Sequence, residues 1–357
     1  MYHFYFRMKT NFCLWVSFVL TAVLLPVTSS MQSSSIVSNI LPKVDKMSNQ
    51  ILDIHDGNTL LIDNVFYWFG ASYGYCQEMA SGCESIQVGS CGFNLNHTVS
   101  LATSTDLISW TLVGEILPLQ NRATGILFSP WVAKSASTGL YVLWVNILPV
   151  INGSGDFDKS FYSVYTSSTP TGPFVVANPN VTGLAYTALP DATSIFVDDD
   201  GSGYVAFTHE DSHVNNVQEL TPDLLGPKIQ GGVSPQIGNT NNEGILMFKR
   251  DALYYIMFGQ CCCFCGEGTN VEVHVSTSPL GPYNLTGQLI PSGSVWHGQT
   301  GSVWYTGVDW VLQGDRWQSA PDHIKAHDFS YVSPIRFDAY GNVESIIAFE
   351  TNVTISY

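Results

Sequence analysis

Short apolar runs alternate with polar turn residues along most of the chain. Five of these runs are rich in aromatic residues; each follows a short polar turn, and another apolar run precedes that turn. This pattern is typical of β-hairpins with short loops, and helical spacing of apolar residues is almost absent. The five runs are FYWFGAS at 66–72, LYVLWVN at 140–146, GYVAFTH at 203–209, LYYIMFG at 253–259 and VDWVLQG at 308–314.

The serial repetition of these hairpins predicts the fold class. Five units within residues 31–357 leave about 65 residues for each unit, which is close to the size of a propeller blade with its loops. The sequence therefore predicts an all-β protein, a five-bladed β-propeller that forms a single domain over residues 31–357. A two-sheet sandwich or jelly roll is the alternative, and the five copies in series favour the propeller.

Residues 1–30 have the composition of a signal peptide. Arg7 and Lys9 precede an apolar stretch at 12–27, and small residues follow at 28–30. Five Asn-x-Ser/Thr sequons fit a protein that is glycosylated on export. We therefore expect a secreted glycoprotein, located outside the cell or in an endomembrane or vacuolar lumen, with an uncleaved signal anchor as the alternative. The sequon residues are Asn96, Asn152, Asn180, Asn284 and Asn352.

The charge balance narrows the range of partners. The chain of 357 residues has a formal net charge of −16 and only 13 Lys and Arg residues. An acidic surface repels phosphate groups, so neither nucleic acid nor an anionic membrane is an expected partner. No run after the signal peptide is apolar enough to span a bilayer, so no membrane association is expected once the signal is removed.

Seven cysteines remain after the signal peptide, in two loop regions. Cys76, Cys83 and Cys91 lie in the first region, and the run CCCFC at 261–265 forms the second. Disulfides are the usual state of cysteine in an oxidising compartment. We expect disulfides that join one loop region to the other, with at least one cysteine left over because seven is odd. A zinc cluster in CCCFC is the alternative.

Three acidic residues precede the first strand of three different hairpins: Asp56, Asp191 and Glu243. The first strand of a propeller blade lines the central channel, so acids at its start would converge at one mouth of the channel. Glycoside hydrolysis uses such a group, because one carboxyl protonates the leaving oxygen and another activates water or attacks the sugar. A third acid can raise the pKa of the proton donor. A turn or cap role is the alternative for any one of them.

The segment around Asp56 resembles glycoside hydrolase family 43, whose members are five-bladed propellers. In that family the general base precedes a hairpin with an aromatic pair ten and eleven positions later, and Phe66 and Tyr67 occupy those positions here. Gly57 stands in place of the family's proline. The resemblance implies that Asp56 is the general base.

Two further segments extend this resemblance over nearly the whole chain after the signal peptide. DATSIFVDDDG at 191–201 resembles the segment of the family's pKa-modulating Asp. MFKR at 247–250, followed by two tyrosines at 254–255, resembles the run after the family's general acid. The resemblance implies that Asp191 is the pKa modulator and that Glu243 is the general acid.

Within the family, the exo-β-1,3-galactanase branch is the most similar. LYVLWV, SPLGPY, GQTGSVW and GDRW are the supporting pieces. In that branch the Asp base is missing and a Gln of the fifth blade is proposed to replace it; Gln299 resembles that Gln. This chain differs in two respects. It retains Asp56, and it has Phe-Ser-Pro-Trp at 128–131 where Glu-Arg-Pro-Lys is expected.

Four further residues are candidates for sugar binding beside Gln299. His55 and His297 are adjacent to proposed channel residues, with a hydrogen-bonded structural histidine as the alternative. Trp131 and Trp296 lie near the channel ends of their repeats and could stack on a sugar ring, with packing between blades as the alternative. The sequence contains nothing that demands a metal ion or another cofactor, so none is expected.

Together these patterns predict a secreted glycosidase that cleaves side chains of polysaccharides. We expect it to be exo-acting and inverting, of the galactanase or β-galactosidase, arabinofuranosidase or xylosidase type, with an oligo- or polysaccharide as its partner. The alternative is a catalytically inactive propeller that binds carbohydrate or another protein, because the fold alone does not fix the activity.

Overall fold

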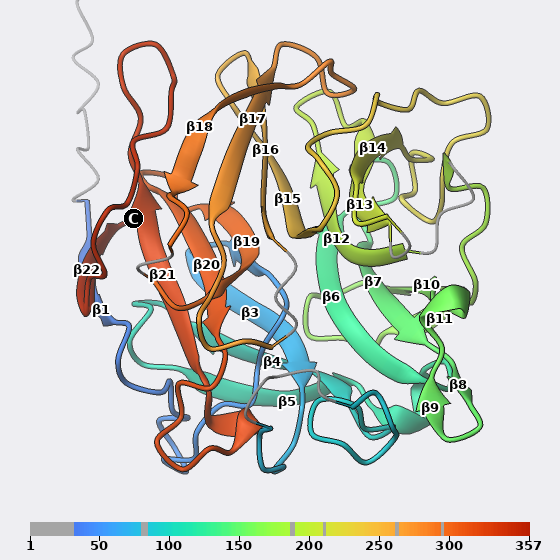
Figure 1. The fold of residues 1–357 in the computed structure, drawn as a ribbon, viewed down its shortest axis with the longest axis vertical. Coiled ribbons are helices and arrows are strands. Elements are labelled where there is room, and N and C mark those ends of the chain that lie inside the picture. The colour runs from blue at the N-terminus through green and yellow to red at the C-terminus, as the bar shows by residue number, and fades with distance from the viewer. Residues whose placement is uncertain (1–31, 80–84, 186–189, 210–211, 261–263, 294–295) are drawn as a thin grey trace, which may run out of the picture. The chain divides into compact units, whose positions relative to one another are not determined.

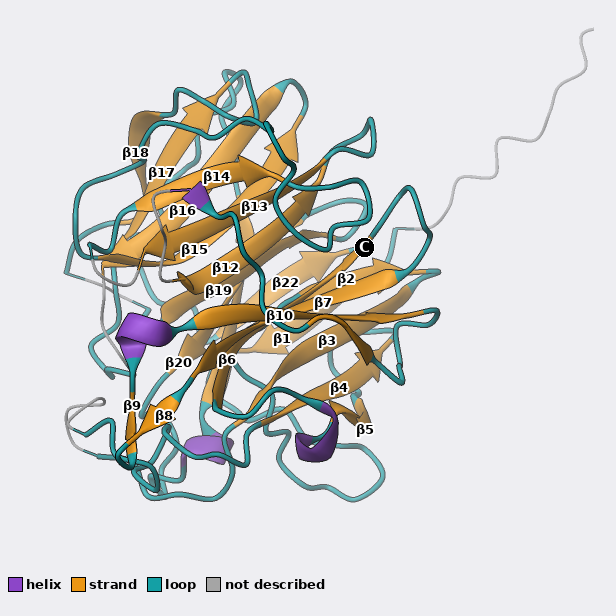
Figure 2. Cartoon of the chain, turned by 90° about the vertical axis from the view of Figure 1, so that its right-hand side faces the viewer, coloured by secondary structure: helices purple, strands orange, loops and turns teal. Residues whose placement is uncertain are grey.

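β-Strands make up nearly all the regular structure of the protein (Figure 2). The computed structural model describes residues 32–357 apart from 80–84, 186–189, 210–211, 261–263 and 294–295, so the predicted signal peptide lies outside the described residues. Residues 33–357 form one unit. Within the described part, no helix has the length and apolarity needed to cross a bilayer. The 3₁₀-helices there are single turns at Leu119–Asn121, Phe157–Lys159 and Lys325–His327.

Most of the described strands form five antiparallel sheets, which are the blades of a five-bladed propeller, and the predicted fold class is thereby confirmed (Figure 1). In each blade the strands follow one another in chain order, beginning at the channel. Blade 1 consists of β2 (Thr59–Ile62), β3 (Val65–Ser72), β4 (Thr98–Ser104) and β5 (Thr111–Leu117). Blade 2 consists of β6 (Ile126–Lys134), β7 (Tyr141–Leu148), β10 (Phe161–Ser167) and β11 (Val175–Asn178).

The three remaining blades follow the same order. Blade 3 consists of β12 (Pro190–Val197), β13 (Gly203–His209) and β14 (Asn215–Glu219). Blade 4 consists of β15 (Asn242–Arg250), β16 (Leu253–Gln260), β17 (Val271–Ser276) and β18 (Asn284–Ile290). Blade 5 consists of β19 (Gln299–Tyr305), β20 (Trp310–Arg316) and β21 (Phe329–Ile335). The five aromatic-rich runs of the sequence become β3, β7, β13, β16 and β20, the second strand of each blade.

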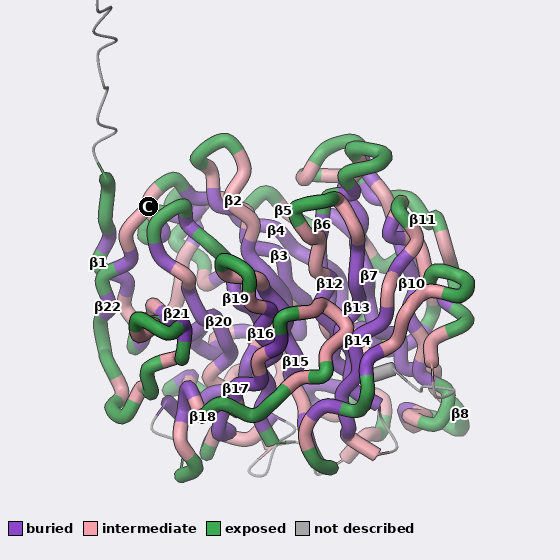
Figure 3. Tube along the Cα trace, turned by 90° about the horizontal axis from the view of Figure 1, so that it is seen from above, coloured by how far each residue is buried: buried purple, intermediate pink, exposed green. Residues whose placement is uncertain are grey.

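Local turn chemistry accounts for the first hairpin. β2 and β3 are joined by the two residues Asp63 and Asn64, which have φ values of 50° and 62°. Positive φ at both central positions is the type I′ geometry that matches the twist of a two-residue hairpin, and Asp and Asn tolerate it. The aromatic run of β3 then packs into the core (Figure 3).

The first strands of neighbouring blades lie against one another. β6, β12, β15 and β19 are in contact in series, and the ring is completed by contacts of β6 with β3 and of β19 with β2. Four of these first strands carry a β-bulge, at Phe128/Trp131, Pro190/Thr193, Glu243/Leu246 and Thr300/Ser302. A bulge breaks the pairing and redirects side chains. The candidate catalytic residues lie at or beside these bulges.

A separate two-stranded sheet joins the ends of the described chain. β1 (Ser34–Ser38) pairs antiparallel with β22 (Asn352–Ser356), at the edge of the molecule in Figure 1. Val37, Val353 and Ile355 of this pair belong to a buried cluster that also holds Phe66 of blade 1 and Trp304 of blade 5. The pair therefore packs against the junction between the first and last blades. A further two-stranded piece, β8 (Val150–Ile151) and β9 (Ser154–Gly155), follows β7.

Candidate active site

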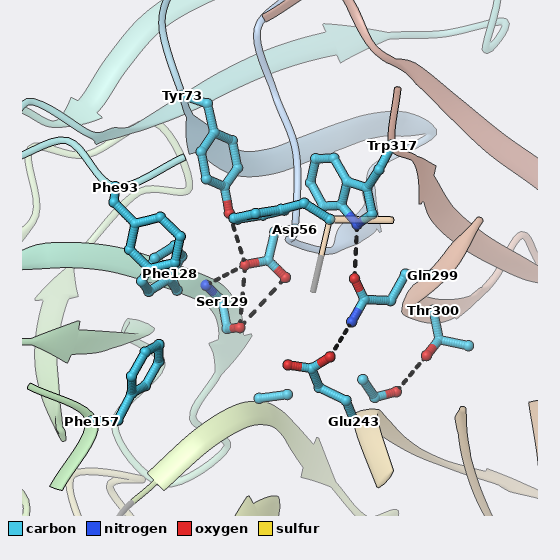
Figure 4. A pocket seen from close by; sticks show the side chains of 13 residues that line it. Asp56, Tyr73, Phe93, Phe128, Ser129, Phe157, Glu243, Gln299, Thr300 and Trp317 are labelled. Atoms are coloured by element: carbon cyan, nitrogen blue, oxygen red, sulfur yellow. Dashed lines mark hydrogen bonds between the residues drawn. The ribbon is translucent and has the colours of Figure 1, made fainter. Parts of the chain in front are cut away.

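A pocket lies where the bulged ends of the first strands meet (Figure 4). Every blade supplies at least one lining residue, and the space amounts to about 540 Å³ out to its open mouth. Asp56, Glu243 and Gln299, all predicted from the sequence, lie in this one pocket. The lining residues are Asp56, Tyr73, Phe93, Phe128, Ser129, Phe157, Ala192, Glu243, Gly244, Phe264, Gln299, Thr300 and Trp317.

The carboxylate of Asp56 is held by groups from blades 1 and 2. Its Oδ2 accepts the backbone N–H of Ser129 at 2.7 Å, the Ser129 hydroxyl at 3.3 Å and the Tyr73 hydroxyl at 3.4 Å. The backbone N–H of Asp56 donates to Oδ2 of Asp315 at 2.8 Å. Asp56 and Ser129 have φ values of 53° and 45°. The bulge that follows Phe128 thus turns the N–H of Ser129 onto the carboxylate.

Burial raises the pKa of Asp56 to about 7, and the nearby charge of Asp315 acts in the same direction, while the hydrogen bonds from Ser129 and Tyr73 oppose the rise. Ionised and protonated Asp56 are therefore both accessible near neutral pH. A carboxyl with such a pKa is suited to accept a proton in that range.

The surroundings of Gly57 explain why this chain has glycine where the family has proline after the base. A Cβ at this position would lie 2.2 Å from the backbone oxygen of Phe69 and 2.8 Å from Cα of Gly70. The chain after Asp56 therefore passes directly against β3, and no side chain fits.

Substitution of Gly57 by Ala is expected to lower the free energy of unfolding by about 2–4 kcal/mol, because the backbone of β3 has to move. Urea unfolding measures this loss. Gly287→Ala is the matched control, since no atom lies within 4 Å of a Cβ there. Equal stability of the two variants would contradict the close approach at Gly57.

A chain of hydrogen bonds orients Glu243. The side-chain amide of Gln299 donates to Oε2 of Glu243 at 2.7 Å, and the indole N–H of Trp317 donates to Oε1 of Gln299 at 2.7 Å (Figure 4). Both ends of the Gln299 amide are therefore engaged. The Gln299 amide acts here as a positioning group for the carboxyl of Glu243.

The bulge beside Glu243 is fixed by the neighbouring blade. The Thr300 hydroxyl donates to the backbone oxygen of Gly244 at 2.7 Å. Gly244 has φ of 67°, and a Cβ there would lie 2.3 Å from that hydroxyl. Only glycine allows this approach, which sets the direction of Glu243.

The other predicted site residues either have side chains outside the described part or do not line this pocket. The backbone of Asp191 lies in β12, but its side chain is outside the described part, so its role as pKa modulator stays a prediction. His297 is exposed and does not line the pocket. His55 is buried behind the pocket wall, with Nδ1 3.2 Å from Asp315 and Nε2 3.5 Å from Asp53.

The hydrogen-bonded structural role applies to His55. Burial lowers the pKa of His55, but the hydrogen bond and charge of Asp315 and the charge of Asp53 outweigh burial, so its pKa is raised above 6.5. Its ring lies 5.9 Å from that of Tyr73 and 5.7 Å from that of Trp317. The His55 side chain thus supports two residues of the pocket wall from behind.

The two predicted tryptophan platforms are core residues. Trp131 donates its indole N–H to the backbone oxygen of Ile195 at 3.0 Å, and Trp296 donates to that of Thr269 at 2.7 Å. Both are buried and neither lines the pocket, so stacking on a sugar in this pocket is not their role. Trp317 lines the pocket instead.

Sequence reasoning missed the aromatic wall of the pocket. Phe93, Phe128, Phe157 and Tyr73 line the space (Figure 4), and Phe264 lines it as well. Phe93 follows Cys91 by two positions and Phe264 immediately precedes Cys265. This proximity to cysteines was the feature of the sequence that could have indicated that Phe93 and Phe264 lie in the pocket wall.

The cysteines support the loops that carry these rings. Cys76 and Cys91 form a disulfide within the first loop region, so the prediction of a link between the two regions is wrong for this pair. Cys265 is also disulfide-bonded, which excludes the zinc alternative at that residue. Cys83 and the cysteines at 261–263 lie outside the described residues. Among the described residues, no group of three or more His, Cys, Asp or Glu is placed to hold a metal ion.

A buried cation lies behind the aromatic wall. The ammonium of Lys325 lies 3.7 Å from the ring centroid of Phe264, 3.9 Å from that of Trp317 and 3.7 Å from a carboxylate oxygen of Glu78. Burial lowers the pKa of Lys325, and the charges of Asp328 and Glu78 act against that shift. The ion pair and the two rings together hold the ammonium.

Substitution of Lys325 by Met is expected to destabilise the protein by about 3 kcal/mol, because it leaves Glu78 buried without its cation. Urea unfolding at pH 7 measures the loss, and adding Glu78→Gln should recover part of it. Lys159→Met, which removes an exposed ion pair with Asp156, should cost under about 1 kcal/mol. If Lys325→Met and Lys159→Met lowered the free energy of unfolding equally, the buried ion pair of Lys325 with Glu78 would not stabilise the fold more than an exposed pair.

Residues 55–316 match the model of the glycosyl hydrolases family 43. The chain belongs to this family. The matched segment begins next to Asp56 and ends next to Trp317, so it contains blades 1 to 4 and the first two strands of blade 5. The recognition of family 43 from the sequence is confirmed.

Two curated relatives carry glycosidase names. The chain is 28% identical over 208 residues to the β-D-galactofuranosidase xynD of Aspergillus niger, covering 54% of this chain and 56% of that protein. It is 25% identical over 328 residues to the arabinoxylan arabinofuranohydrolase of Bacillus subtilis, covering 82% of this chain and 60% of that protein. The family 43 chain therefore matches somewhat over half the length of each.

Solved structures share the fold. A family 43 β-1,3-galactosidase solved with galactodeoxynojirimycin has a TM-score of 0.69 at 20% identity, covering 88% of this chain and 99% of that one. An exo-β-1,3-galactanase from Clostridium thermocellum has a TM-score of 0.69 at 21% identity, with coverages of 87% and 64%. At these identities the likeness concerns the propeller architecture.

Proposed function

We propose that this family 43 protein is an exo-acting, inverting glycoside hydrolase. The observation that carries the proposal is the presence of Asp56 and Glu243, from opposite parts of the ring of blades, in one pocket (Figure 4). Two carboxyl groups that flank a sugar are the minimal machinery for glycoside hydrolysis. Membership of the family and the glycosidase names of its relatives support the same activity.

In the proposed reaction, Glu243 gives its proton to the glycosidic oxygen as the bond to the anomeric carbon breaks. Asp56 takes a proton from the water that attacks that carbon from the opposite face, and the sugar leaves with inverted configuration. The Ser129 N–H fixes the direction of the Asp56 carboxylate. Asp191 is proposed to keep Glu243 protonated, as the family resemblance implies.

Asp56 is a better candidate for the base than Gln299. The amide of Gln299 already donates to Glu243 and accepts from Trp317. An amide is also a far weaker base than a carboxylate, and Asp56 has its pKa near 7. Gln299→Leu should therefore reduce activity by misaligning Glu243, without removing the fall in kcat/KM at low pH that protonation of Asp56 produces.

The shape of the site supports attack on a terminal sugar. The lining residues come from all five blades and from the loops that carry Phe93 and Phe264, which together form a pocket. A pocket accommodates the end of a chain and not its middle. The galactofuranosidase, arabinofuranohydrolase and β-1,3-galactosidase names of similar proteins mark galactosides and arabinofuranosides as the first substrates to test.

Secretion is part of the proposal. The predicted signal peptide and five sequons motivate it, and all five sequon asparagines are exposed, as glycan attachment requires. Expression in a secreting eukaryotic cell, followed by treatment with an N-glycan-removing enzyme, should shift the mass of protein in the medium. Retention of an unshifted protein inside the cell would contradict secretion.

Turnover of aryl β-galactoside, α-arabinofuranoside and β-xyloside and of β-1,3-galactan tests the hydrolase proposal. Proton NMR of the first product formed gives the anomer, and inversion predicts the opposite configuration to the substrate. Release of single sugars supports exo action, and release of longer products contradicts it. A folded protein that binds glycans without product would favour the alternative of a binding propeller.

A further inference from the structure

The polar side of the pocket offers few free hydrogen-bonding groups. The Ser129 N–H and the Tyr73 hydroxyl are directed to Asp56, while Trp317 and Gln299 are bonded in series to Glu243. Each of these four groups already makes a hydrogen bond within the protein. A bound sugar would therefore find its polar partners mainly at the two carboxylates.

Among the described residues, four phenylalanines form the opposite side of the pocket, and we call them the phenylalanine group: Phe93, Phe128, Phe157 and Phe264. Phe93, Phe128 and Phe264 pack edge-on or tilted with ring centroids 5.7 to 6.3 Å apart, and Phe157 lies 6.4 Å from Phe93. All four residues line the pocket, and Phe93, Phe128 and Phe157 are labelled in Figure 4. A hydroxyl directed at these rings would lose its hydration without gaining a partner, whereas a methyl group would gain apolar contact.

Charge also restricts the ligand. None of the described lining residues is Lys, Arg or His, and two of them are carboxylic acids. The ammonium of Lys325 lies behind Phe264 and Trp317, outside the set that lines the pocket. An acidic sugar would meet like charge without a cation, so the ligand is neutral.

From these three features we propose that the pocket selects a terminal 6-deoxyhexose, whose C5 carries a methyl group, over the parent hexose with its hydroxymethyl group. The inference rests on the proposed function, because it places the terminal sugar in the pocket of Asp56 and Glu243. The phenylalanine group, with Phe93 in contact with the other three rings, receives the methyl. A pentopyranose has only hydrogen at C5, so it leaves the space beside the phenylalanine group empty. Its kcat/KM should lie between those of the deoxyhexose and the hexose.

Matched 4-nitrophenyl glycosides test this order, because within each series only the C5 substituent changes. One series is β-D-galactoside, β-D-fucoside and α-L-arabinopyranoside; others are β-D-glucoside, β-D-quinovoside and β-D-xyloside, and α-L-galactoside with α-L-fucoside. In at least one series we expect kcat/KM for the deoxyhexoside to exceed that for the hexoside by about tenfold to a hundredfold. A preferred hexoside, or turnover of furanosides alone, overturns the inference and leaves the hydrolase proposal intact.

Variants identify the residues that produce the preference. Phe128→Gln and, independently, Phe157→Gln should bring the deoxyhexoside to hexoside ratio close to one. Phe161→Gln is the control, since Phe161 packs against the same hydrophobic cluster but does not line the pocket. An unchanged ratio in both pocket variants would contradict the role of the phenylalanine group.

A binding measurement separates this inference from the catalytic proposal. Calorimetry with Glu243→Gln compares D-fucose with D-galactose, D-quinovose with D-glucose, and L-fucose with L-galactose. Tighter binding of a deoxy sugar supports the inference even if the wild type shows no turnover, in which case only the hydrolase proposal fails. Equal or weaker binding of all deoxy sugars, or no binding of any, overturns the inference.

Discussion

Replacement of Glu243 by Gln is expected to lower kcat on substrates with poor leaving groups by about 10³-fold, because no other group in the proposed reaction gives a proton to the glycosidic oxygen. Gln keeps the size of the side chain and can still bond to Gln299, so the fold and the pocket should persist. Steady-state kinetics on an alkyl or oligosaccharide substrate gives the loss, and a thermal melt verifies folding.

The dependence of the activity loss on the leaving group shows whether Glu243 is a proton donor or a structural residue. On a 2,4-dinitrophenyl glycoside, whose leaving group needs little protonation, Glu243→Gln should lose only about tenfold. Glu344→Gln, which changes an exposed carboxylate, is the matched control and should behave as the wild type. An equal loss of activity on both classes of substrate would assign Glu243 to binding or structure and not to proton donation.

Replacement of Asp56 by Asn is expected to lower kcat by about 10³-fold on every substrate, whatever the leaving group, because it removes the proposed base. In the wild type, kcat/KM should fall about tenfold per pH unit below about pH 7, as Asp56 with its pKa of about 7 becomes protonated. The pH profile of the wild type and the substrate independence of the variant are the two readouts. Retained activity in Asp56→Asn, lost on further Gln299→Ala substitution, would move the base to Gln299.

The same substitution should stabilise the protein. The pKa of Asp56 is raised from 3.8 to about 7 on folding, so the folded state binds the extra proton and wild-type stability falls as pH rises through this window. Asn carries no such charge. Asp56→Asn should therefore have a free energy of unfolding higher by about 1–3 kcal/mol at pH 8, with a smaller gain at pH 5, because each pKa unit corresponds to about 1.4 kcal/mol. Urea unfolding at the two pH values tests both the sign and the window.

The second strands of the blades were predictable because their signals are local. In β3, β7, β13, β16 and β20 an aromatic run follows a turn within a few residues, so sequence distance and spatial distance coincide. Asp56 and Glu243 were predictable for a related reason. Each lies at a fixed offset from such a hairpin, and the propeller brings those offsets to one end of the channel.

Contacts between segments far apart in the chain could not be predicted in this way, because no local sequence pattern indicates them. The packing of the blades, and not the local sequence, decides that Trp131 reaches Ile195 and that Trp317 reaches Gln299. The role of Ser129 depends on a bulge that reverses the direction of one N–H. The rings of Phe93 and Phe264 were hidden for the same reason, since the loops that carry them have no periodicity to indicate which side chains face inward.

The pairing of β1 with β22 has a consequence for the biosynthesis of the protein. Ser34 lies opposite Ser356. β1 therefore stays unpaired until the ribosome has made β22, more than three hundred residues later. Each blade can form as it emerges, but the contact that locks the first blade to the last is absent until residue 356 has left the exit tunnel. A nascent chain stalled earlier would expose the cluster around Val37 and Phe66 and become a substrate for chaperones. For this propeller, the pairing of β1 with β22 is therefore a late step of synthesis, made after the strands of all five blades.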